Sequence, residues 1–130
     1  MIAPGPAVNP TKTTSHRVIL PFYIYASLAF IVACLLLLTG NSGAFTGHFF
    51  HPQVLAVTHV MALGWGTMMI LGASHQLVPV LIEGKLYSNV LAFLSFGFAG
   101  IGIILLVWGF YHFDFSAVAQ TGGLMIITAF

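Results

Sequence analysis

The chain has 130 residues, of which 59% are hydrophobic and only 4% are charged: three Lys or Arg and two Asp or Glu. Soluble domains carry about 25% charged residues, so this composition excludes an ordinary soluble domain and favours an integral membrane protein. Nucleic-acid binding requires clustered Lys and Arg against the phosphates, and three basic residues are too few, so no nucleic acid is expected as a partner.

Residues 1–17 form a polar, proline-bearing segment, which we expect to be a tail on the cytoplasmic side of a membrane. The apolar run that follows predicts a first transmembrane helix over about 18–38, with Pro21 near its start, where proline is tolerated. This run is too long for a cleaved signal peptide and has no small-residue cleavage site after it. We therefore expect it to be retained as a span, and turn-forming residues at 39–43 to end it.

The second predicted span covers about 53–81, and Pro52 fits its first turn. A helix of this length exceeds the ~30 Å hydrocarbon core of a bilayer, so it must tilt or project. Pro79 is expected to kink it or end it. A third span is predicted over about 87–110, and its glycines at 97, 100 and 102 leave a groove for close approach of a helix or a cofactor.

The fourth apolar run, 117–130, is short. Its roughly 14 residues extend about 21 Å as a helix, which cannot cross a ~30 Å core. We expect a span that is incomplete here, or a chain that continues in a longer protein. The predicted fold is therefore all-α: residues 18–130 form an integral membrane bundle of four transmembrane helices, the fourth short or truncated.

The topology follows from the positions of the basic residues. Lys12, Arg17 and Lys85 fall on one side of the predicted spans, which the positive-inside rule assigns to the cytoplasm. The N-terminus is then cytoplasmic, and a bacterial inner (plasma) membrane is the expected location. His59 lies in the outer half of the bilayer and His75 toward the inner side.

His59 is the first candidate functional residue. Histidine is costly inside a membrane and usually marks a functional position, and neutral imidazole is a common axial ligand of haem iron. Ala56, Gly64 and Gly66 are small neighbours that leave room for a planar macrocycle. The sequence therefore suggests His59 as a haem iron ligand; the alternative is a histidine hydrogen-bonded to a neighbouring helix.

Two further histidines could take part. In a straight α-helix His75 lies about 24 Å along the axis from His59 and roughly 160° around it, so the two cannot bind one iron from the same helix. His75 could be a second ligand, a proton relay or part of a polar cluster at the helix end. His112 beside Asp114 could be a histidine oriented by a carboxylate or part of a solvated turn.

Two stretches, THVMALGWG at 58–66 and QLVPVLIEGKLYSNVLAFLSF at 76–96, carry a family resemblance. They resemble subunit I of the haem–copper oxidase superfamily, the cytochrome c or quinol oxidase polypeptide I. In that family a histidine early in the second span binds the low-spin haem, and it corresponds to His59. The resemblance covers roughly 50–110. It departs from the family at Val60, where a glycine is usual, and in a shorter interval from His59 to Pro79.

The resemblance implies a b-type haem and electron transfer within a respiratory chain. Gly64, Gly66, Gly97 and Gly100 would shape the haem slot, and His75 or His112 is a weaker candidate for the iron. The family's second axial ligand, copper ligands and high-spin haem ligand come from later spans that this chain does not contain. The chain alone is therefore not expected to be catalytic, whereas a longer parent protein would be a terminal-oxidase-like respiratory oxidoreductase.

The second ligand would come from further spans, a further subunit or another copy in a homo-oligomer. Two other functions stay open. One is a self-associating haem-binding or gas-sensing membrane module. The other is a structural or transport membrane subunit without a cofactor.

Overall fold

The computed structural model describes residues 14–40, 43, 47, 50–84 and 86–130. Most of the predicted tail (1–13), most of the loop between the first two spans, and Lys85 in the turn before the third lie outside the described residues. Every regular element of the described part is helical: α1 (His16–Leu38), α3 (Pro52–His59), the π-helix η2 (Val60–Thr67), α4 (Met68–Leu81), α5 (Asn89–Tyr111) and α6 (Ala117–Ala129).

Three helices in this part are long and apolar enough to cross a membrane. They are α1 with 23 residues, the continuous helix Pro52–Leu81 formed by α3, η2 and α4 with 30, and α5 with 23. The fourth helix, α6, has 13 residues and is apolar but shorter. The predicted all-helical architecture of three long apolar helices and a short fourth is confirmed.

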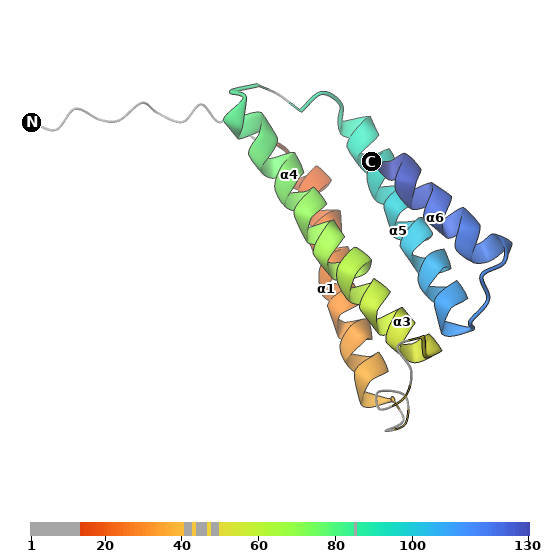
Figure 1. The fold of residues 1–130 in the computed structure, drawn as a ribbon. Helices are drawn as coiled ribbons and strands as arrows, with labels where there is room; N and C mark the ends of the chain where they lie inside the picture. The colour runs from red at the N-terminus through yellow and green to blue at the C-terminus, as the bar shows by residue number, and fades with distance from the viewer. Residues whose placement is uncertain (1–13, 41–42, 44–46, 48–49, 85) are drawn as a thin grey trace, which may run out of the picture.

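The helices form two antiparallel pairs (Figure 1). In the first pair α1 lies along η2 and α4, and in the second α6 lies along α5. The pairs meet chiefly where α5 packs on α3, with smaller contacts of α5 to η2 and α1. At the other end α4 and α5 diverge (Figure 1). The core between the pairs is formed by buried Phe22, Met68, Ala99 and Ile103.

The α5–α6 pair depends on glycine at its contact surface. A Cβ atom added to Gly102 would lie 2.8 Å from the carbonyl oxygen of Gly122, and one added to Gly109 would lie 2.8 Å from the Cβ of Ala119. The two backbones therefore approach closely, as in membrane helix pairs built on small residues. The Ser95 hydroxyl also donates a hydrogen bond across this interface to the Ala129 carbonyl oxygen at 2.6 Å.

Backbone hydrogen bonds cap the C-terminal end of α5. The Asp114 N–H donates to the Gly109 carbonyl oxygen at 2.8 Å and the Phe113 N–H to that of Phe110 at 3.1 Å, the two bonds of a Schellman motif. Phe113 adopts φ 53°, the left-handed conformation this motif requires. The Asp114 carboxylate then accepts from the Ser116 N–H at 3.0 Å, ahead of α6. Hydrogen bonding from the Ser116 side chain and N–H lowers the pKa of Asp114.

The π-helix η2 changes the register of the second long helix. Its backbone makes wider turns than an α-helix, and the Thr67 hydroxyl donates to the carbonyl oxygen five residues back, that of Ala62, at 3.0 Å. One extra residue within a turn rotates the rest of the helix backwards about the helix axis by about 100°. The angle of roughly 160° expected between His59 and His75 is therefore wrong, because it assumed a straight α-helix; the π-helix reduces it to about 60°.

Candidate functional site

His59 is the last residue of α3, and its side chain is half-buried. Its Nδ1 lies 2.7 Å from the carbonyl oxygen of Leu55, one turn earlier in the same helix. A carbonyl oxygen only accepts hydrogen bonds, so Nδ1 carries the ring proton and Nε2 carries the lone pair. Metal-binding histidines are commonly oriented by such a bond from the other ring nitrogen to a backbone carbonyl.

The His59 ring packs against α5. Its centroid lies 4.1 Å from that of Phe110 with the planes tilted by 42°, and Phe110 in turn contacts Phe115 at 5.5 Å. Nε2 makes no hydrogen bond to any described residue. In the described part, no side-chain nitrogen or oxygen is both fully buried and without a hydrogen-bond partner. Nε2 is therefore not fully buried. Among the described residues His59 makes no hydrogen bond to a neighbouring helix, and its bond lies within α3.

Gly64 and Gly66, predicted to line a haem slot, lie in η2. Gly64 is buried against α1, where an added Cβ would lie 2.8 Å from the Cβ of Ala29. At Gly66 the nearest atom to an added Cβ is the Met61 carbonyl oxygen, at 3.4 Å within the same π-helix. Gly64 thus permits close packing of two helices, and Gly66 contributes to the wide turn that follows His59.

Gly97 and Gly100 have different surroundings, although they lie one turn apart on α5. No atom lies within 4 Å of a Cβ added to Gly97, whereas one added to Gly100 would meet the Tyr25 ring at 3.3 Å. The Tyr25 hydroxyl donates to the carbonyl oxygen of Gly100 at 2.9 Å and so joins α1 to α5. The four predicted glycines therefore have different neighbours, and their role in a haem slot stays a prediction.

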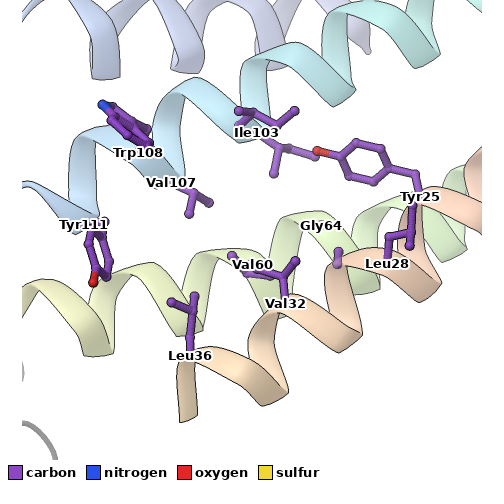
Figure 2. A pocket seen from close by; sticks show the side chains of 12 residues that line it. Tyr25, Leu28, Val32, Leu36, Val60, Gly64, Ile103, Val107, Trp108 and Tyr111 are labelled. Atoms are coloured by element: carbon purple, nitrogen blue, oxygen red, sulfur yellow. The ribbon is translucent and has the colours of Figure 1, made fainter. Parts of the chain in front are cut away.

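A cavity of about 510 Å³ lies between α1, η2 and α5, and its lining is almost entirely apolar. Figure 2 shows Tyr25 at one end and Trp108 and Tyr111 at the other. Val60 and Gly64 line it, whereas His59 does not. The volume lies within the range of roughly 300–1,000 Å³ that is typical of small-molecule sites.

These residues meet only part of what a haem requires. His59 offers an oriented nitrogen that is not fully buried, and the next residue, Val60, lines the apolar cavity. However, the described ranges contain no group of three or more His, Cys, Asp and Glu residues placed to hold a metal. Phe110 also covers one face of the imidazole. The described residues thus offer one candidate axial ligand for a haem iron.

His75 occupies a second, separate polar site near the end of α4. Its Nδ1 bonds the Leu71 carbonyl oxygen at 2.7 Å, and its ring stacks on Phe22 of α1, with centroids 5.1 Å apart and planes 24° apart. Its own carbonyl cannot be satisfied within the helix, because the residue four positions on is Pro79, which lacks an N–H. The Thr14 hydroxyl donates to this carbonyl oxygen instead, at 2.8 Å.

Replacing Thr14 by valine should destabilise the protein by about 1–3 kcal/mol, because the His75 carbonyl loses its donor. The Pro79→Ala variant supplies an N–H at position 79, and in that background Thr14→Val should cost much less. Thermal unfolding of the four proteins of this double-mutant cycle measures the difference. Equal costs in both backgrounds would contradict the pairing of Thr14 with the proline-exposed carbonyl.

His112 follows α5 and is exposed; its ring contacts are with Trp108 at 4.5 Å and Tyr111 at 5.5 Å. The structure thus unites His59 with Phe110 and His75 with Phe22, and it places His112 with the aromatic residues at the end of α5. Sequence reasoning missed Thr14, Tyr25 and Phe110. Only Thr14 had a usable signal, since a proline four residues after His75 implies an unpaired carbonyl.

The described part is therefore an all-helical protein whose three long helices have the length and composition of membrane spans, with an oriented histidine in the second. No known protein family, curated protein or solved structure matches this chain.

Proposed function

We propose that this chain is an integral protein of a bacterial inner membrane, with its N-terminus in the cytoplasm. Three apolar helices of 23, 30 and 23 residues support this placement, since about 20 apolar residues cross a bilayer. Their side chains facing away from the core include many large hydrophobic residues, such as Leu20, Ile70 and Ile104, each more than half exposed. In water such a surface would drive aggregation, whereas lipid tails solvate it.

Within that membrane we propose that His59 binds the iron of a b-type haem and that the protein takes part in respiratory electron transfer, as the low-spin-haem region of an oxidase-like protein. The observation that carries this proposal is the bond from Nδ1 to the Leu55 carbonyl oxygen, which leaves the Nε2 lone pair oriented and not fully buried. Bound haem would supply one-electron chemistry. Further spans, a further subunit or a second copy would supply the other ligand and the rest of the enclosure.

The absorption spectrum tests this assignment. The protein purified from haem-replete membranes should show a Soret band, and His59→Ala should abolish it because the principal proposed iron ligand is lost. His16→Ala, at the exposed start of α1, is the matched control and should keep the band. Circular dichroism of each variant separates loss of haem from loss of fold. A wild-type protein without the band, or a folded His59→Ala protein that keeps it, would refute the proposal.

A cofactor-free structural or transport subunit is the second candidate, and the packing of His59 favours it. Its Nδ1 is satisfied by its own helix, and the ring centroid lies 4.1 Å from that of Phe110, as in a purely structural residue. On this hypothesis His59→Phe keeps the stability of the protein and no Soret band is present in any variant.

A gas-sensing module would instead show a Soret band that shifts on addition of carbon monoxide, because it has an open iron position.

A further inference from the structure

The apolar cavity beside Val60 is a slot that runs parallel to α1 and α5. On α1 its lining begins at Tyr25 and ends at Leu36, and on α5 it begins at Ile103 and ends at Tyr111. At 1.5 Å per residue these stretches extend about 16 Å and about 12 Å. Figure 2 shows the slot between the two helices, with Tyr25 at one end and Leu36 and Tyr111 at the other.

The slot occupies one half of the depth of a bilayer. Tyr25 lies near the middle of α1, and Leu36 lies in its last turn. Ile103 likewise lies just past the middle of α5, and Tyr111 is its last residue. Half of a ~30 Å hydrocarbon core is about 15 Å, which is the depth that the chains of one leaflet fill. The slot therefore matches one leaflet in length and in position.

Tyr25 closes the end of the slot near the membrane midplane. Its hydroxyl donates to the Gly100 carbonyl oxygen at 2.9 Å and so bridges α1 and α5 there. Because this hydroxyl already has an acceptor, a molecule in the slot needs no polar group at that depth. At the opposite end Trp108 and Tyr111 line the slot, and Trp and Tyr side chains favour the membrane–water interface.

The slot is open along its side. Leu28 and Val32 of α1 and Ile104 and Trp108 of α5 line it, and each of these side chains is between 45% and 61% exposed. A long apolar molecule can therefore enter sideways from the bilayer without crossing a polar boundary. Lipid tails are as apolar as this lining, so the gain on entry comes from packing: an unfilled slot forgoes dispersion contacts along its whole length.

We propose that this slot binds an acyl chain of a membrane phospholipid from the leaflet that contains the C-terminal ends of α1 and α5. The head group lies beside Trp108 and Tyr111, and the chain extends toward Tyr25. A phospholipid is the source because its chains have the length of one leaflet and already lie along the open side. This assignment rests on the bilayer placement proposed above and does not involve His59, which does not line the cavity.

Photolabelling at two depths tests the proposal. The wild-type protein is placed in nanodiscs with a trace of phosphatidylcholine that carries a diazirine either near the ester or at the end of one chain. Mass spectrometry then maps the labelled residues. The shallow probe should label around Leu36 and Tyr111, and the deep probe around Tyr25 and Ile103. The reverse order would overturn the orientation, and labelling spread evenly over the exposed faces of all helices would overturn the site.

Two variants fill the slot from opposite walls. Val107→Trp and Val32→Trp should each reduce labelling by the deep probe about tenfold, which corresponds to about 1.4 kcal/mol of lost packing. Ile101→Trp is the matched control, because Ile101 is an exposed residue of α5 outside the lining, and it should leave the labelling unchanged. Circular dichroism checks that each variant is folded. Unchanged labelling in both folded filled variants would contradict the site.

Two other occupants have distinct outcomes. Oleate that competes with the probe more strongly than unlabelled phosphatidylcholine does would assign the slot to a free fatty acid and overturn the phospholipid. A wild-type dimer that Val107→Trp converts to a monomer, measured by light scattering, would place a second copy there and overturn it as well. Protease protection in the same nanodiscs checks the bilayer placement separately, and the Soret band checks the haem.

Discussion

Replacing Gly122 by alanine should destabilise the protein strongly, whereas the same change at the next residue, Gly123, should be neutral or stabilising. A Cβ on Gly122 would lie 2.7 Å from the backbone nitrogen of Leu106 and 2.8 Å from the carbonyl oxygen of Gly102. Backbone atoms cannot swing aside as a flexible side chain can, so α6 must move away from α5. A Cβ on Gly123 meets nothing within 4 Å.

Overpacking of this kind costs about 1–3 kcal/mol or more, while alanine in place of glycine within an exposed helix gains about 1 kcal/mol. The two variants should therefore differ by at least about 2 kcal/mol in thermal or denaturant unfolding. The same comparison can be repeated on α5, with Gly102→Ala as the tight position and Gly97→Ala as the open one. Similar stabilities within either pair would contradict the close backbone contact of α5 and α6.

Deletion of Gly66 should be more damaging than any single substitution. It removes the extra residue of η2, and a regular α-helix there would rotate α4 by about 100°. Gly72 now packs against α1, where an added Cβ would lie 3.1 Å from the Cβ of Phe22, and His75 stacks on the same residue. Both contacts, together with the burial of Met68, would be lost.

We expect a loss of more than about 4 kcal/mol, or a failure to fold, measured by yield of folded protein and by thermal unfolding. The matched control combines this deletion with an alanine inserted between Thr67 and Met68, which restores the residue count. If the count sets the register of α4, the control should recover most of the stability. A deletion variant as stable as the wild type would show that η2 does not determine where α4 places Gly72 and His75.

The helices were predictable because the signal for each is local and redundant. Three runs of some 20 or more apolar residues are separated by glycine, proline and polar turns, and any part of such a run indicates the same structure. The oriented state of His59 has a local cause too, since the Leu55 carbonyl lies one turn away in the same helix. The ligand role of His59 and the oxidase-like function stay predictions.

The contacts between helices were not predictable in the same way. Gly64 was expected beside a haem, and it lies against Ala29; Gly100 was assigned to the same slot, and it lies under the Tyr25 ring. A small residue in an apolar helix has the same sequence signature whether a macrocycle, a neighbouring helix or lipid lies beside it. Only the positions of the other helices distinguish these cases.

The sequence by itself determined the all-helical class, the number and length of the apolar helices, and a histidine within the second. Tertiary structure alone decided the rotation of His75, the attachment of α6 to α5, and the apolar cavity between α1, η2 and α5. The physical reason is that α and π turns differ by a single residue, which leaves no clear pattern in the local sequence. The choice at Val60–Thr67 therefore depends on α3 packing on α5 and α4 packing on α1 at once.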